Sequence, residues 1–73
     1  MSEKVVAINA RNQFRGRIRE IIRGPVASEV DIETVAGIVT SVATTRSITD
    51  LDLREGSEVL TVFKATEVLI AKL

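Results

Sequence analysis

One third of the residues in this chain are branched at Cβ, and this feature limits its fold more than any other. The 73 residues include ten Val, eight Ile and seven Thr. Such side chains lose rotamer freedom in a helix but pack well on the pleated surface of a sheet. A chain of this length is also too short for two ordinary domains. The sequence therefore predicts one all-β domain that spans residues 1–73.

Apolar and polar residues alternate with a period of two along much of the chain, which is typical of strands with one buried face. The alternation fails near Ile21–Ile22, within an expected strand at residues 14–23, which indicates a β-bulge. In the clearest strand, the residues expected to face inward are Val26, Ser28, Val30 and Ile32. The expected strands cover residues 4–9, 14–23, 26–33, 38–44, 58–65 and 67–72.

Residues 44–53 interrupt this strand pattern and favour one or two helical turns. Ile48 and Leu51 stand three positions apart, and Thr45 or Ser47 can supply an N-cap. The chain is therefore expected to form five or six short strands, with one short helix before the penultimate strand. So few strands cannot safely leave their edges open, and we expect a small OB-like barrel that is closed or nearly closed.

The chain contains no Cys and no His. This composition excludes disulfides, haem ligation, most zinc and copper sites and every Cys or His nucleophile. No nucleophile elbow, P-loop or dinucleotide-binding glycine motif occurs either. No apolar stretch approaches the roughly 18 residues of a membrane span, and the N-terminus lacks the order of a signal peptide. The sequence predicts a soluble, cytoplasmic protein that is not an enzyme and does not bind a membrane.

Phe14 and Phe63 are the only aromatic residues, so the core is short of large side chains. Chains below about 70–80 residues rarely obtain enough stability from one core and need an additional source. Disulfides are impossible here and metal ligands are few, which leaves oligomerisation. We therefore expect this chain to be a subunit of a homo-oligomer.

The charges balance overall but are distributed unevenly. Residues 1–24 carry six basic and two acidic groups, net +4, while residues 25–73 carry four basic and eight acidic groups, net −4. The basic segment has two interpretations. In one, Arg15, Arg17 and Arg19 pair with acidic residues of the neighbouring strand, which are Glu29, Asp31 and Glu33. In the other, the segment attracts an anion or a partner chain. Because the net charge is zero, a nucleic-acid partner is not expected.

Three short segments concentrate hydrogen-bond donors without carboxylates. They are Asn9–Gln13, Thr44–Ser47 and Lys64–Thr66. Each segment alone is compatible with a solvated connection or a helix cap. The second segment also stands at an expected helix N-terminus, where free backbone N–H groups favour an anion. Together the three segments suggest a cage of N–H groups, hydroxyls and positive charge.

The same segments resemble the molbindins, the Mop family of small molybdate-binding proteins. The opening is similar to a family motif that reads SARNQ, a hydrophobic residue, any residue and Gly. Here the segment reads Asn9, Ala10, Arg11, Asn12, Gln13, Phe14, Arg15 and Gly16. The middle motif is met by Thr44, Ser47, Leu51, Leu53, Gly56 and Val59, and the final one by Lys64, Ala65, Thr66 and Val68. The three motifs occur in order and at matching spacing from Ile8 onward.

This resemblance implies an OB-like barrel that assembles into a homo-oligomer, expected to be a hexamer built as a trimer of dimers, with oxyanions held between subunits. It implies roles for Arg11 as a guanidinium and N–H donor, for Ser47 as a hydroxyl and amide donor, and for Lys64 as the positive charge. Asn9 stands where the family usually has Ser. The full set of implied oxyanion-binding residues is Asn9, Ala10, Arg11, Thr44, Ser47, Lys64 and Ala65.

The expected ligand is molybdate or tungstate, held as the oxyanion with no protein atom bonded to the metal. Molybdate at neutral pH is a dianion without a proton, so every contact must come from a donor, and charged donors give the stronger bonds. The resulting prediction is a store or buffer for these oxyanions. Two alternatives stay open: an assembly or regulatory domain of the same fold without ligand, and an OB-type nucleic-acid-binding module. The sequence also leaves open whether a pterin binds.

Overall fold

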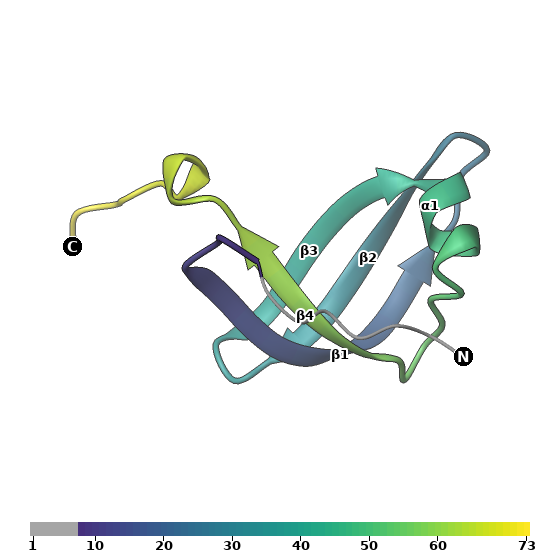
Figure 1. Cartoon of the computed structure of the whole chain (residues 1–73), viewed down its shortest axis with the longest axis horizontal. Helices are drawn as coiled ribbons and strands as arrows, with labels where there is room; N and C mark the ends of the chain where they lie inside the picture. The colour runs from purple at the N-terminus through teal and green to yellow at the C-terminus, as the bar shows by residue number, and fades with distance from the viewer. Residues whose placement is uncertain (1–7) are drawn as a thin grey trace.

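The computed structural model describes residues 8–73, which form a curled antiparallel sheet of four strands and one short α-helix (Figure 1). The strands lie in the order β3-β2-β1-β4. Their bounds are Asn12–Ile22 for β1, Ala27–Thr34 for β2, Gly37–Thr44 for β3 and Glu58–Phe63 for β4. Helix α1 (Thr45–Asp50) separates β3 from β4, and a single 3-10 turn, η1 (Ala65–Glu67), follows β4. The predicted all-β class with one short helix is confirmed.

Strand β1 is the longest strand and pairs with β2 on one side and β4 on the other. A β-bulge interrupts its register with β2 between Ile18 and Glu20, so that Arg19 is the extra residue. The bulge was expected near Ile21–Ile22 and lies slightly earlier. It shifts the alternation by one residue, so that Ile21 follows Ile18 on the face that packs against the core.

The core is small. The buried apolar side chains among residues 8–73 come from β1, β2 and α1 and are Ile18, Val30, Ile32 and Ile48. Ser28 is buried beside them, as predicted. The prediction that Val26 faces inward was wrong, since Val26 is 76% exposed. Strand β2 begins one residue later, and Val26 belongs to the turn that joins β1 to β2.

Helix α1 forms where the sequence predicts it, and its first residues fasten it to the sheet. The N-cap is Thr44, whose hydroxyl accepts the N–H of Ser47 at 3.1 Å. The expected caps, Thr45 and Ser47, were therefore wrong. The Thr45 hydroxyl instead donates to the carbonyl of Gly24 at 2.7 Å and lies 2.7 Å from the hydroxyl of Ser28. No helix in the described part of the chain is long and apolar enough to cross a membrane.

The number of strands differs from the expected five or six. Residues 4–7 of the first expected strand lie outside the described residues, and Ile8 and Asn9 belong to no strand. The last expected strand, residues 67–72, was wrong, because the chain passes through η1 and then extends away from the sheet (Figure 1). A strand needs a neighbour to pair with, and this segment has none within residues 8–73. Helix α1 consequently precedes the last strand rather than the penultimate one.

The arginines of β1 lie on its solvent-exposed face and form surface ion pairs. Arg15 contacts Glu58 at 2.9 Å, and Arg17 contacts the same carboxylate at 3.7 Å. Arg19 pairs with Glu33 at 3.8 Å. The predicted pairing with acidic residues of β2 is thus correct for Arg19 alone. Arg15 and Arg17 pair instead with an acidic residue of β4, which lies on the other side of β1. These contacts explain much of the basic segment as a solvated strand face.

Gly16 marks the closest approach of β1 to β2. A Cβ at this position would lie 2.5 Å from the carbonyl oxygen of Glu33 and 2.8 Å from Cγ2 of Ile32. Gly16→Ala should therefore force the strands apart and lower the free energy of unfolding by about 1–3 kcal/mol. Urea denaturation at fixed protein concentration measures this effect. The control Arg15→Ala removes only a surface ion pair and should change stability by less than about 1 kcal/mol. Equal stability of the two variants would contradict the close approach.

Candidate functional site

The pairing of β1 with β4 brings two of the donor segments together. The register pairs Asn12, the first residue of β1, with Phe63, the last residue of β4. Because the strands are antiparallel, the residues just before β1 face those just after β4. Ala10 and Arg11 are therefore brought close to Lys64 and Ala65. Figure 1 shows this meeting point at the start of β1 and the end of β4.

These residues line a pocket with a volume of about 560 Å³, which we call the strand-end pocket. Five of the seven predicted site residues belong to it. Two apolar residues, Ile8 and Val62, complete the wall together with Thr66. The lining residues are Ile8, Asn9, Ala10, Arg11, Val62, Lys64, Ala65 and Thr66.

All the polar side chains of the strand-end pocket can donate hydrogen bonds. Arg11 and Lys64 supply two positive charges, Asn9 supplies an amide and Thr66 a hydroxyl. Ala65 is the first residue of η1, a position whose backbone N–H has no partner within the helix. Among residues 8–73, no carboxylate forms an ion pair with Arg11 or Lys64. The pocket can therefore accept an anion with two negative charges.

Gln13 braces the loop that carries Arg11. Its side-chain amide donates a hydrogen bond to the carbonyl oxygen of Ala10. This bond turns one backbone acceptor of the pocket wall toward Gln13. The sequence placed Gln13 in a donor segment, and the structure shows that it donates within the loop. Thr66 was likewise part of a donor segment but not of the predicted site, and its place in the pocket follows from its position just after Ala65.

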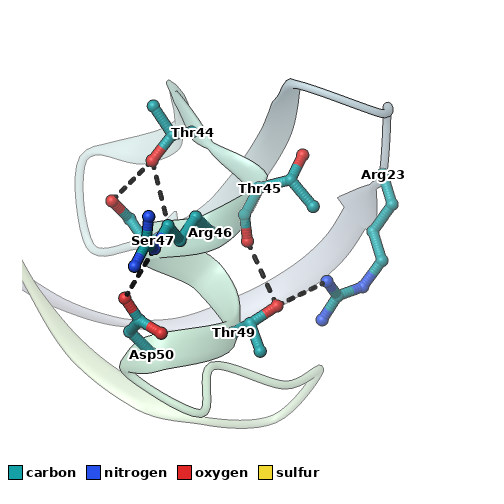
Figure 2. A network of polar contacts seen from close by, with 7 residues as sticks. All are labelled: Arg23, Thr44, Thr45, Arg46, Ser47, Thr49 and Asp50. Atoms are coloured by element: carbon teal, nitrogen blue, oxygen red, sulfur yellow. Dashed lines mark hydrogen bonds and ion pairs between the residues drawn. The ribbon is translucent and has the colours of Figure 1, made fainter.

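Thr44 and Ser47 lie elsewhere, at the start of α1 on the opposite side of the molecule (Figures 1 and 2). Figure 2 shows that their side chains face each other, with the two hydroxyl oxygens 2.7 Å apart. The Ser47 N–H is used in the helix cap. Within one chain, therefore, Thr44 and Ser47 do not join the other five residues. Ser47 instead lines a second and larger groove between β3 and β4.

The charges beside Thr44 and Ser47 are of both signs. The Arg46 guanidinium lies 3.8 Å from the Asp50 carboxylate one turn later (Figure 2). Arg23 directly follows β1, and its guanidinium donates to the hydroxyl oxygen of Thr49 at a distance of 3.5 Å. Near α1, therefore, a carboxylate opposes the charge of Arg46, whereas Arg23 contacts a neutral hydroxyl. In the described part of the chain, no three His, Cys, Asp or Glu side chains gather where they could hold a bare metal ion.

Comparisons with known proteins identify the family of this chain. Residues 8–70 match the family model of the TOBE domain. Molybdenum-pterin-binding protein 3 of Clostridium pasteurianum is 41% identical over 66 residues, which cover 89% of this chain and 97% of that protein. A molybdate-binding protein from Sporomusa ovata has a TM-score of 0.86 at 30% identity, and the match covers 92% of this chain and 100% of that chain.

A third similar structure is that of the cytoplasmic molybdate-binding protein ModG with molybdate bound. Its TM-score is 0.76 at 32% identity, and the match covers 81% of this chain and 43% of that chain. The structural matches confirm the predicted OB-like fold, and the sequence matches confirm the resemblance drawn from the three donor segments. This chain therefore belongs to the TOBE-domain family, and within it to the molbindins, the Mop proteins.

Proposed function

We propose that this protein binds molybdate or tungstate in the strand-end pocket and serves as a cytoplasmic store or buffer for the oxyanion. The observation that carries the proposal is that Arg11 and Lys64 line the same pocket and that its lining residues include no acid. Relatives that bind molybdate or molybdenum-pterin, one of them described as cytoplasmic, support it. These relatives are named as binding proteins, which supports a binding role rather than an enzymatic one.

The chemistry of the pocket suits a tetrahedral dianion. Two cationic side chains balance its charge, and hydrogen bonds from cations to an anion are roughly twice as strong as neutral ones. The N–H of Ala65 and the amide of Asn9 can donate to the remaining oxygens. The carbonyl of Ala10 accepts a bond from Gln13, which draws one acceptor of the wall into a contact within the loop.

We further propose that the site is completed in a homo-oligomer, a hexamer built as a trimer of dimers. Thr44 and Ser47 lie far from the strand-end pocket of their own chain (Figure 1). Their hydroxyls can therefore reach an anion held at that pocket only from another copy. The small number of buried apolar side chains supports the same arrangement, since a core of this size gives a single subunit little stability.

An assembly or regulatory domain without ligand remains the alternative, and Asn9 is the residue that favours it. Its side chain is larger than the Ser that usually stands at this position in the family, and it lies in the pocket wall. If Asn9 closes the pocket, Asn9→Ser should create molybdate binding where the natural chain has none. If the pocket binds as proposed, Asn9→Ser should retain binding. Equilibrium dialysis of the two proteins separates these functions.

Removing either pocket cation should weaken binding. Arg11→Ala and Lys64→Ala each delete a charge-assisted donor, so each should raise the Kd for molybdate at least about 10-fold. Isothermal titration calorimetry at constant ionic strength measures the change. Arg54→Ala is the matched control, because Arg54 lies outside the pocket and pairs with Asp52 at 3.0 Å. Unchanged affinity in both pocket variants, or an equal loss in the control, would contradict the assignment.

The pocket should discriminate between oxyanions by size and protonation. Molybdate and tungstate are nearly equal in size, so their affinities should be similar. Sulfate is smaller and would leave the donors stretched. Phosphate at neutral pH carries a proton, and the side chains of the pocket lining offer it only two neutral acceptors, the Asn9 carbonyl and the Thr66 hydroxyl. Competition dialysis against labelled molybdate checks this order. Displacement by an equal concentration of sulfate would exclude the proposed mode of recognition.

The thermal stability should depend on concentration and on ligand. Because assembly supplies buried area that the single chain lacks, Tm should rise with protein concentration. Molybdate should raise Tm further, since an anion that binds only the assembly stabilises it by mass action. Scanning calorimetry at several concentrations tests both effects. A stable monomer of 8.0 kDa in sedimentation experiments, with and without molybdate, would contradict the proposed oligomer.

A further inference from the structure

One residue, Thr45, fastens the start of α1 to the turn between β1 and β2. Its N–H donates to the carbonyl oxygen of Val26 at 2.8 Å, and its hydroxyl donates to the carbonyl oxygen of Gly24 at 2.7 Å. The Ser28 hydroxyl lies 2.7 Å from the same Thr45 hydroxyl oxygen. These three contacts fix the backbone at the start of α1 relative to strands β1 and β2.

The hydroxyl protons of this cluster have one consistent arrangement. Thr45 has a single hydroxyl proton, and the Gly24 carbonyl can only accept, so this proton is donated to Gly24. Ser28 must then be the donor in its bond to Thr45. Ser28 is only 3% exposed, so its hydroxyl depends on this bond and not on water. The two bonds run from Ser28 through Thr45 to Gly24, and consecutive bonds of this kind strengthen each other.

The anchored backbone carries the hydroxyl pair of Thr44 and Ser47. The Thr44 hydroxyl accepts the N–H of Ser47 at 3.1 Å (Figure 2). The two hydroxyl oxygens are 2.7 Å apart, so one of their two protons forms the bond between them and the other is free for a ligand. Both residues are exposed, so burial does not hold their side chains in place. The position of the free O–H therefore depends on the backbone at Thr45.

A second contact supports the same turn of helix without using the hydroxyl pair. The Thr49 hydroxyl donates to the carbonyl oxygen of Thr45 at 3.2 Å and accepts a bond from Arg23 at 3.5 Å. Figure 2 shows Arg23, Thr45 and Thr49 on one side of α1 and the pair of Thr44 and Ser47 on the other. The anchoring contacts thus leave the donors of the pair accessible.

We propose that Thr45 is the positioning residue for the hydroxyl pair of Thr44 and Ser47 in oxyanion binding. The inference rests on the proposed function, in which this pair completes a site at the strand-end pocket of another copy. Thr45 does not touch the anion, because its hydroxyl proton is committed to Gly24. Its effect arises because binding groups must be held within about 0.5 Å of their productive positions by contacts behind them.

The first test compares the Kd for molybdate of three variants by isothermal titration calorimetry, at equal assembly mass in sedimentation experiments. Thr45→Val removes the anchoring hydroxyl and should raise Kd about 3- to 10-fold, the effect of one lost hydrogen bond. Thr45→Ser keeps the hydroxyl and should stay within about 2-fold of the natural chain. Thr34→Val is the matched control, since its half-buried hydroxyl donates to the carbonyl of Gly37 at 2.8 Å, outside the strand-end pocket. Its Kd should be unchanged.

A double variant separates positioning from stability. Thr45→Val leaves the buried Ser28 hydroxyl without its acceptor, so Tm should fall. Ser28→Ala/Thr45→Val removes that hydroxyl as well and should recover part of the lost Tm. Its Kd should remain as high as that of Thr45→Val, because the bond to Gly24 is still missing. If affinity recovers together with Tm, Thr45 acts through stability alone and the proposal is overturned.

Ser47→Ala distinguishes failure of this inference from failure of the proposed site. If Ser47→Ala and Thr45→Val both raise Kd, the positioning role is supported. If Ser47→Ala raises Kd and Thr45→Val does not, the positioning role is overturned while the proposed site is retained. If Ser47→Ala leaves Kd unchanged, the hydroxyl pair takes no part in binding, and the positioning role is again overturned.

Deuterium exchange of the Ser47 N–H, followed by NMR without added oxyanion, tests the anchoring by itself. Thr45→Val should accelerate this exchange, because the cap formed with Thr44 loses its fixed backbone. Thr34→Val should leave it unchanged. Equal exchange rates in Thr45→Val and the natural chain would overturn the proposal. Absence of molybdate binding by the natural chain would refute the proposed function, and the exchange rates would still decide whether Thr45 positions the pair.

Discussion

The pairing of β1 with β4 is the interaction on which the rest of this structure depends. It joins the first strand to the last, and its register pairs Asn12 with Phe63, the neighbours of Arg11 and Lys64. A shift of one residue would separate these cations and turn the side chains of each strand to the wrong face. Gln13 lies on β1 beside this point and fixes the preceding loop through the carbonyl of Ala10. Secondary structure alone thus builds the strand-end pocket from residues more than 50 positions apart in the sequence.

The same sheet leaves the subunit incomplete. Four buried apolar side chains in residues 8–73 form a thin core, and the groove above it is open between two strand edges. The homo-oligomer proposed above would remedy both deficits. A protein that completes its core through association can also place a ligand at the contact, where binding and assembly reinforce each other. Storage of an oxyanion would then require the association of subunits and no other conformational change.

Much of the local structure could be predicted from the sequence. The alternation of residues 26–33 correctly identified Ser28, Val30 and Ile32 as buried, and the break in pattern at residues 44–53 located α1. Five of the seven predicted site residues converge because antiparallel pairing of two strands suffices to join them. The hydrogen bonds of Thr45 to Gly24 and Ser28 escaped prediction, since they depend on tertiary placement and not on helix-cap preference.

The C-terminal segment, residues 67–72, shows what a local sequence pattern does not predict. Its composition favours a strand, but β-propensity does not specify which edge a strand joins or which chain supplies that edge. The separation of Thr44 and Ser47 from the strand-end pocket was not predicted either, because the spacing of motifs along the sequence does not specify which of them meet in the fold. Val26 was misplaced for a simpler reason, as the alternation continues by one residue into a turn.

The most direct test of this account is a crystal structure of the protein grown with tungstate, with the tungsten located by anomalous scattering. The account predicts a tungsten peak at the strand-end pocket, with oxyanion oxygens within about 3.2 Å of the side-chain nitrogens of Arg11 and Lys64. An ordered tungstate that contacts neither residue would contradict it.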